Sequence, residues 1–322
     1  MAVMKYRQWK SPEPMKFEGK TMGTTWHVTV FDPQKRNFQY SLDSLLILVN
    51  RAISTYDSTA EISEFNQSEK GIKSRLPFFI PPLKISEKVF QQSGGAFDPT
   101  VMPLVNLWGF GPAKVERPDT TVVRKVLEVV GLEKVSHSGD SIFKSVPGTQ
   151  LDFSAIGQGY GADVLTEFLK SKGIKNMLVE VGGEGMAIGM NEQSGKPWKL
   201  GLVNPAAPES FFGFIELSDR SFSTSGNYFN YREIDGVRYA HTIDPKSGFP
   251  TAHSIMSASV FAENCALADA WATAFMSMGH EKAITLLKEH PELDACLIWS
   301  VKGGVEKHLT PGAEKFITFE KP

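Results

Sequence analysis

Asp269 and Thr273 stand four residues apart in CALADAWATAFMSMG, a run of apolar and small residues that predicts a helix over about 264 to 278. At this spacing, a carboxylate and a hydroxyl share one face of the helix. Both are hard oxygen donors, which Mg²⁺ accepts when it keeps water and substrate phosphates in its shell. A structural interpretation also exists: Asp269 would favour the positive end of the helix, and Thr273 would bond back to the 269 carbonyl.

A second reactive group is His241, in RYAHTIDPKSGFP (238–250). The residues before it read as a strand, and a turn follows through Asp244, Pro245 and Gly248. Imidazole has a pKa near the working pH of most enzymes, which suits a general base. A histidine that is only hydrogen-bonded within the fold is the alternative.

The run Gly157-Gln158-Gly159-Tyr160-Gly161-Ala162 matches G-x-G-x-x-A at the start of a predicted helix. With a strand before it and Glu180 near the end of the next strand, it resembles a dinucleotide-binding fingerprint. Two other interpretations remain open at this point. The glycines can let backbone N–H groups approach an anion, or they can allow close strand–helix packing.

Composition excludes several classes of protein. The 322 residues are 41% hydrophobic and 22% charged, an ordinary globular mix, and the formal net charge is -2. No basic cluster favours nucleic acid, and no run of eighteen apolar residues predicts a membrane span. Zinc-protease, P-loop and nucleophile-elbow motifs are missing from the sequence. Small molecules or another protein are therefore the expected partners.

The elements that must position these groups alternate irregularly. A strand over 24–31, helices over 42–53, 83–93 and 119–130, and a strand-helix-strand run over 151–181 are predicted from periodicity. Two strand-like runs flank Asp235-Gly236, the strongest hairpin signal in the chain. We therefore expect an α+β (mixed α/β) fold with antiparallel sheets and flanking helices. Residues 1–20 are expected to form an N-terminal extension, and 21–322 a single domain.

Eight segments, taken in order, resemble the ApbE family of FAD:protein FMN transferases. They are TMGTTW, STYDSTAEISEFN, GGAFDPTVMPLVNLWGFG, LDFSAIGQGYGAD, VEVGGEGMAIG, STSGNY, HTIDPKSGFP and CALADAWATAFMSMG, and they run from about residue 21 to 280. The resemblance implies an ApbE-like, T-fold-type architecture. It also implies cleavage of FAD at its diphosphate in the presence of Mg²⁺, transfer of FMN to a threonine of a target protein, and release of AMP.

The resemblance also implies roles for individual residues. FAD contacts are implied at Met22, Tyr56, Ala96, Phe97, Asp98, Asp152, Gln158 and Ile243. Ala155, Asp269 and Thr273 would hold the metal, and His241 would be the catalytic histidine. Residue 155 is alanine where some members have threonine, so only its backbone carbonyl can reach the metal. Gln158 replaces a common lysine or glutamate, and Ala272 replaces a metal-binding aspartate of some members.

Three alternatives to the transferase are carried forward. An FAD diphosphatase would use the same site with water as acceptor, and a non-catalytic flavin-binding protein would have a degenerate metal site. A dinucleotide-dependent oxidoreductase would bind NAD(P)H at the glycine-rich run. The resemblance implies an acceptor such as a subunit of a membrane redox complex, and a periplasmic or lipoprotein location. The opening MAVMKYRQWKSPEP has neither a signal-peptide pattern nor a lipidation cysteine, so the cytoplasm is the alternative.

Overall fold

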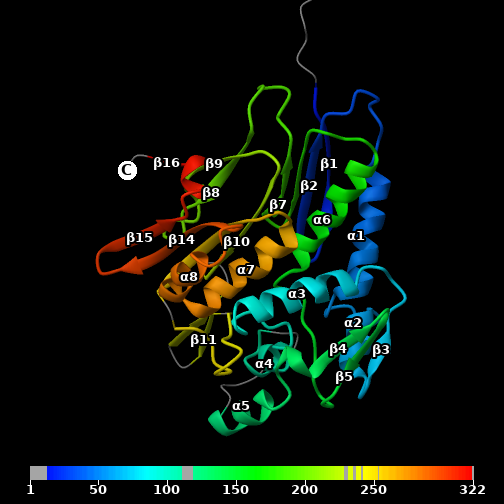
Figure 1. The fold of residues 1–322 in the computed structure, drawn as a ribbon, viewed down its shortest axis with the longest axis vertical. Helices are drawn as coiled ribbons and strands as arrows, with labels where there is room; N and C mark the ends of the chain where they lie inside the picture. The colour runs from blue at the N-terminus through cyan, green and yellow to red at the C-terminus, as the bar shows by residue number, and fades with distance from the viewer. Residues whose placement is uncertain are drawn as a thin grey trace, which may run out of the picture.

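The computed structural model describes residues 13–110, 119–227, 231–234, 237–240, 242–252 and 254–320, with the backbone alone for 231–234 and 237–240. Its centre is one eight-stranded sheet (Figure 1). The strands, in spatial order, are β1 (Met15–Thr21), β2 (Thr24–Val30), β6 (Met177–Val181), β7 (Glu184–Ile188), β10 (Arg220–Gly226), β13 (Ile255–Phe261), β14 (Asp294–Val301) and β15 (Gly304–Leu309). Every neighbouring pair in this sheet is antiparallel.

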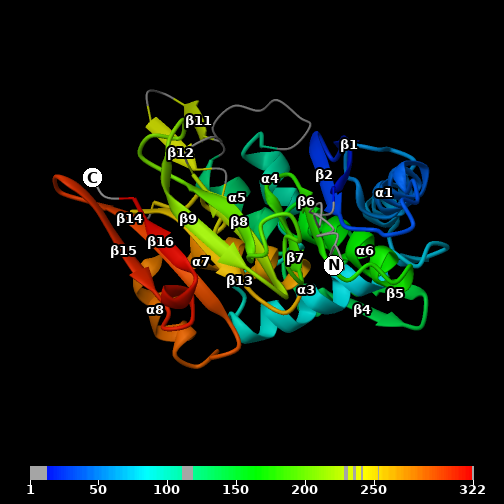
Figure 2. The ribbon, with the colours of Figure 1, turned by 90° about the horizontal axis from the view of Figure 1, so that it is seen from above.

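Both faces of the central sheet are covered. Its strands alternate side chains between the faces, so Val260 packs beneath the helices while Phe261 packs on the other side. A three-stranded sheet covers that second face: β8 (Trp198–Val203), β9 (Phe211–Leu217) and β16 (Ile317–Phe319). The result is a layer of helices, a large sheet and a small sheet (Figure 2). Such layering buries the apolar face of each element.

The helices gather on one side of the central sheet (Figure 1). They are α1 (Gln39–Ile53), α2 (Glu61–Gln67), α3 (Ile80–Gln92), α4 (Met102–Leu107), α5 (Thr120–Leu127), α6 (Gly157–Ser171), α7 (Cys265–Met278) and α8 (His280–Leu287). The described backbone also has a hairpin formed by β11 (Tyr231–Ile234) and β12 (Val237–Ala240). A small sheet contains, in spatial order, β3 (Gly71–Lys73), β5 (Ser141–Lys144) and β4 (Val135–Ser138). Short 3₁₀ helices span Leu132–Lys134 and Ala313–Lys315.

Helix α7 is almost entirely buried, which explains its apolar and small composition. Its first turn is capped from two directions. The Asn264 side chain accepts a hydrogen bond from the Leu267 N–H at 2.9 Å. The Asp163 carboxylate on α6 accepts from the N–H groups of Cys265 (2.7 Å) and Ala266 (2.8 Å). These bonds satisfy donors that a helix start leaves unpaired, and they fix α7 against α6.

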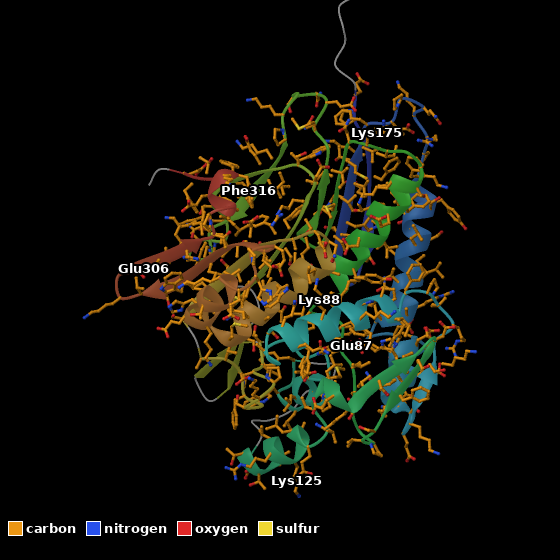
Figure 3. All side chains as sticks on the ribbon, in the orientation of Figure 1. Glu87, Lys88, Lys125, Lys175, Glu306 and Phe316 are labelled. Carbon is orange, nitrogen blue, oxygen red and sulfur yellow. The ribbon has the colours of Figure 1, made fainter. Side chains whose placement is uncertain are left out.

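Many charged side chains lie at the periphery of the molecule (Figure 3). Lys125 on α5, Lys175 between α6 and β6, and Glu306 on β15 are exposed (Figure 3). On α3, Glu87 lies 3.4 Å from His137 and Lys88 lies 3.9 Å from Glu263. Within the described residues, no helix is both long and apolar enough to cross a lipid bilayer.

Most of the predicted elements are confirmed, and one is wrong. The predicted strand at 151–156 is irregular backbone, which leads directly into α6. The central sheet begins at Met15, within the residues expected to form the N-terminal extension.

Candidate active site

A cavity of about 940 Å³ opens beside the helix layer, where the start of α6 and the middle of α7 meet the ends of the sheet. Segments from across the chain line it: the β1–β2 turn, residues 54–56, 96–99 and 152–158, the β6–β7 turn, the end of β10, residues 242–243, and α7. Its carboxyl groups belong to Asp98, Asp152, Glu184 and Asp269. Among the described residues that line it, there is no lysine, arginine or histidine.

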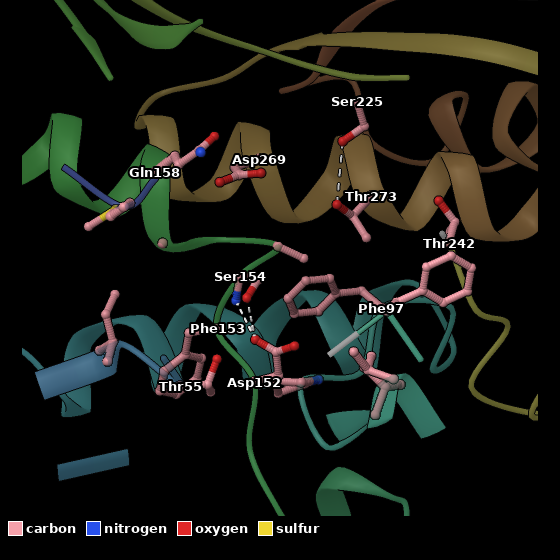
Figure 4. A pocket seen from close by; sticks show the side chains of 18 of the residues that line it. Thr55, Phe97, Asp152, Phe153, Ser154, Gln158, Ser225, Thr242, Asp269 and Thr273 are labelled. Carbon is pink, nitrogen blue, oxygen red and sulfur yellow. Dashed lines mark hydrogen bonds between the residues drawn. The ribbon is translucent and has the colours of Figure 1, made fainter. Parts of the chain in front are cut away.

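Helix α7 supplies one wall of the cavity. Asp269 and Thr273 both point into it, as their four-residue spacing predicts (Figure 4). The Thr273 hydroxyl lies 3.4 Å from the hydroxyl of Ser225 on β10. Asp269 is outside the first turn of the helix, which contains no acidic residue. The interpretation of Asp269 as a group that only favours the helix start is therefore wrong.

The glycines of α6 bring this helix against α7. An ideal Cβ on Gly159 would lie 2.5 Å from the Cys265 carbonyl oxygen and 2.9 Å from the Asp269 Cβ. Because Gly159 has no side chain, its N–H reaches Asp269 Oδ2 at 3.1 Å. Close packing explains this glycine, while Gly157 and Gln158 line the cavity.

Two buried carboxyl groups meet at this wall. Glu184 is 7% exposed and Asp269 is 4% exposed. Burial raises the pKa of both groups, and the Asp269 carboxyl raises the pKa of Glu184 further. The Glu184 Oε2 atom is buried without a hydrogen-bond partner. Buried carboxylates with no basic neighbour need a cation or a proton to offset their charge.

The facing wall carries an aspartate and an aromatic ring. Asp152 Oδ1 accepts hydrogen bonds from the Ser154 N–H at 2.8 Å and the Ser154 hydroxyl at 2.6 Å (Figure 4). Burial raises the pKa of Asp152. Phe97 lies between this wall and α7 and is 2% exposed. Tyr56 is 74% exposed, so it lies at the rim.

Asp98 and Ala96 extend the same wall. Asp98 Oδ1 accepts from the Thr100 N–H at 2.8 Å and its hydroxyl at 2.6 Å, and burial raises the Asp98 pKa to about 6. Ala155 and Ile243 also line the cavity. A flat aromatic ligand fits between such walls because ring faces and carboxylate acceptors are both presented.

Met22 enters the cavity from the β1–β2 turn. Thr21 pairs with Thr24, so the turn has two residues, and both Met22 (φ 49°) and Gly23 (φ 73°) have positive φ. Two-residue hairpins favour this geometry, which costs a non-glycine residue about 1 kcal/mol or more. The Met22 side chain lies over Gly161 of α6.

His241 lies outside the described residues, so its predicted catalytic role stays a prediction. The residues that follow it, from Thr242 to Pro250, make contacts that the structure describes. Thr242 and Ile243 line the cavity, and Ile243 forms a bridge with Pro250. The Trp108 indole N–H donates to the Gly248 carbonyl at 2.8 Å, which explains the burial of this ring.

The dinucleotide-fingerprint interpretation is wrong. The strands around the glycine-rich run pair antiparallel, and no strand precedes α6 directly. Glu180, the acid of that motif, faces away from the cavity. Its carboxylate lies 2.5 Å from His27 Nδ1 and also accepts from the Gly183 N–H.

Sequence reasoning missed several residues of the site, of which Glu184 is the most buried acid. Ser225 was also missed. Ser221, Ser223 and Ser225 alternate along β10 toward α7, and this period of two in RSFSTSG was the available signal. Ala272 does not line the cavity and is packed in the main core cluster.

Fold and site together define an α+β enzyme-like scaffold whose cavity has an acidic lining. The model of the ApbE family matches residues 22–297. FAD:protein FMN transferase from Vibrio cholerae is 34% identical over 96% of this chain and 94% of its own length. The Escherichia coli K12 protein of the same name is 31% identical, over 97% and 94%.

Solved structures agree with the sequence comparison. The flavin transferase ApbE from Vibrio cholerae superimposes with a TM-score of 0.86 at 32% identity, over 94% of this chain and 99% of that chain. The apo flavinyl transferase ApbE from Pseudomonas stutzeri gives 0.85 at 32%, over 94% and 96%. The chain belongs to the ApbE family.

Proposed function

We propose that this protein is an FAD:protein FMN transferase, which moves FMN from FAD to a threonine hydroxyl of an acceptor protein and releases AMP. Relatives that match nearly the whole chain carry this name, which favours a transferase over the diphosphatase and binding-protein alternatives. The observation that carries the proposal is the composition of one cavity. Its lining includes every residue for which the resemblance implied a role, except His241, which is outside the described residues.

The oxygen donors of the cavity fit a divalent cation. Asp269 and Thr273 offer a carboxylate and a hydroxyl from adjacent helical turns, and residue 155 offers only its carbonyl. The buried Glu184 Oε2 without a partner is a second negative group at the same wall. We infer that Asp269, Thr273 and Ala155 hold Mg²⁺, which would offset charge on the diphosphate oxygens.

The described lining of the cavity contains no basic side chain, which also supports a role for a cation. FAD brings a charged diphosphate into a cavity whose described lining contains four acidic residues and no basic one. Without added positive charge, the diphosphate and these carboxylates would repel each other. We infer that Phe97, Asp98 and Asp152 hold the flat ring system at the other wall, with Tyr56 at the rim.

The proposed reaction is a phosphoryl transfer to the acceptor threonine. The threonine oxygen of the acceptor attacks the phosphorus of the FMN half, a new P–O bond forms, and the P–O bond to the AMP half breaks. AMP leaves with the bridging oxygen. The threonine proton must go to a base, and we infer that His241 accepts it. The acceptor is proposed to be a protein with an exposed threonine segment, such as a subunit of a membrane redox complex.

Intact-mass spectrometry tests the proposed transfer. A candidate acceptor domain is incubated with the protein, FAD and Mg²⁺, with EDTA and His241→Ala as controls. We expect a mass gain of one FMN. The gain should vanish in EDTA, and the His241→Ala rate should fall by about 10²- to 10⁴-fold while FAD binding persists, because a general base contributes about that factor.

Other outcomes discriminate between the alternatives. Conversion of FAD to FMN and AMP without a mass gain, across several acceptor domains, would favour the diphosphatase. Tight FAD binding without any turnover would favour the binding protein. Near-normal transfer by the His241→Ala variant would overturn the role of His241.

A further inference from the structure

Glu184 is not one of the proposed metal ligands, although it lines the same cavity as Asp269. It begins β7 directly after the Gly182-Gly183 turn, and both glycines have positive φ, 65° and 94°. Val181 pairs with Glu184 across this turn. Cross-strand partners share a face, and Val181 packs under α6, so the Glu184 side chain is directed to the helix side.

The surroundings of Glu184 leave it incompletely satisfied. It faces the Asp269 carboxyl on α7 and the Ser223 hydroxyl on β10. Its own Oε2 and the Ser223 Oγ are both buried without a hydrogen-bond partner. Buried polar atoms are normally paired, so the Glu184 carboxyl, which lines the cavity, retains acceptor capacity for a bound cation.

The Gly182-Gly183 turn leaves space for a neighbouring side chain of the cavity. An ideal Cβ on Gly182 would lie 2.7 Å from Gln158 Cδ, so a glycine leaves room for the Gln158 amide. Gln158 is uncharged and lies beside Asp269 in the cavity (Figure 4). The Glu184–Asp269 pair therefore has no basic side chain among the described lining residues to offset it.

We propose that Glu184 is a positioning residue for the cation: it orients the Asp269 carboxylate and adds a second negative charge that raises the affinity of the site for divalent metal. This inference rests on the cation site of the proposed function. Two ionised carboxylates that face each other repel, and a bound cation offsets that repulsion. Mutation of a residue that does not bind the metal but orients one of its ligands typically lowers metal affinity by about 10- to 100-fold.

Mn²⁺ serves as the probe, because the electron paramagnetic resonance signal of free aqueous Mn²⁺ reports binding without FAD or acceptor. We expect Glu184→Gln and Glu184→Ala to raise the Mn²⁺ Kd by about 10-fold or more. Glu167→Gln is the matched control. It removes one charge from the exposed side of α6, where Glu167 forms an ion pair with Lys170, and should bind Mn²⁺ like the wild type.

Thermal melting separates positioning from a structural role. In EDTA, Glu184→Gln should melt at or above the wild-type temperature because the repulsion is gone, and Mg²⁺ should stabilise it less than it stabilises the wild type. Wild-type Mn²⁺ affinity in both variants would overturn the role of Glu184. A lower melting temperature in EDTA with unchanged affinity would make Glu184 purely structural. If the wild type binds no Mn²⁺, the cation site itself fails.

Discussion

Buried carboxyl groups determine what the cavity can hold. Asp98 and Asp152 each accept two hydrogen bonds from a residue two positions later, which fixes the carboxyl plane. Burial nevertheless raises the pKa of both groups, so desolvation outweighs these bonds. A ligand that donates hydrogen bonds to them would stabilise the ionised form. The ring N–H and amino groups of FAD have this property.

A carboxyl away from the site has the opposite shift and gives a pH test of stability. Asp32 has a side chain that is 1% exposed, and Arg36 donates to it at 2.8 and 3.1 Å. These bonds lower the Asp32 pKa from 3.8 to about 2. The stabilisation is therefore complete above about pH 4 and is lost as the pH falls through 2.

Substitution of Asp32 should remove the stability that the Asp32–Arg36 ion pair contributes. Asp32→Asn should lower the free energy of unfolding at pH 7 by about 1–2 kcal/mol, after allowance for the partly exposed Arg36. Urea unfolding from pH 7 to pH 2.5 should show the difference between wild type and variant shrinking. Asp140→Asn, at an exposed turn, is the control. A difference that stays constant with pH would contradict the ion-pair account.

The predictable residues of the site are those whose spacing carries the chemistry. The four-residue spacing of Asp269 and Thr273 places them on one helix face, and both line the cavity. Glu184 was not singled out because its environment depends on α7 and β10, which are distant in sequence. No local pattern reveals that an acid after a glycine turn will meet another acid.

The crossing of α6 and α7 is the element contact on which the site depends. Gly159→Ala would place a Cβ against the Cys265 carbonyl and Asp269, and backbone there cannot yield without moving a helix. We expect a loss of about 1–3 kcal/mol in the free energy of unfolding, as overpacking typically costs. Weaker Mn²⁺ binding should accompany it, because the Gly159 N–H also fixes Asp269.

Gly157→Ala is the matched control in the same helical turn. Its Cβ would meet only the Ile53 Cδ1 at 3.4 Å, and alanine favours a helix over glycine. This variant should be as stable as the wild type or more so. Equal stability and metal affinity in the two alanine variants, measured by urea unfolding and Mn²⁺ titration, would contradict the packing account.

Prediction of the elements succeeded where periodicity was strong. Helix α7 and the capped α5 follow from apolar spacing, and the Asp119 side chain accepts from the Thr121 N–H as an N-cap should. The run LDFSAI failed because its apolar residues pack in the core as irregular backbone. Short apolar runs do not distinguish a strand from buried coil.

The whole molecule builds the site by bringing the ends of distant segments together. One antiparallel sheet joins residues from Met15 to Leu309, and the cavity lies where its turns meet two crossing helices. The α+β class was predictable from irregular alternation and hairpin signals, whereas strand order was not. Long-range pairing such as β2 with β6 leaves no local trace in the sequence.

The dependence of FAD binding on the cation tests the proposed function most directly. Flavin fluorescence titrations measure the FAD Kd of the wild type and of Asp269→Asn, each in Mg²⁺ and in EDTA. We predict that EDTA weakens wild-type binding by about 5- to 150-fold, the usual range for coupled ligands. Asp269→Asn in Mg²⁺ should bind FAD like the wild type in EDTA. Equal FAD affinity in Mg²⁺ and EDTA would contradict a cation-dependent FAD site.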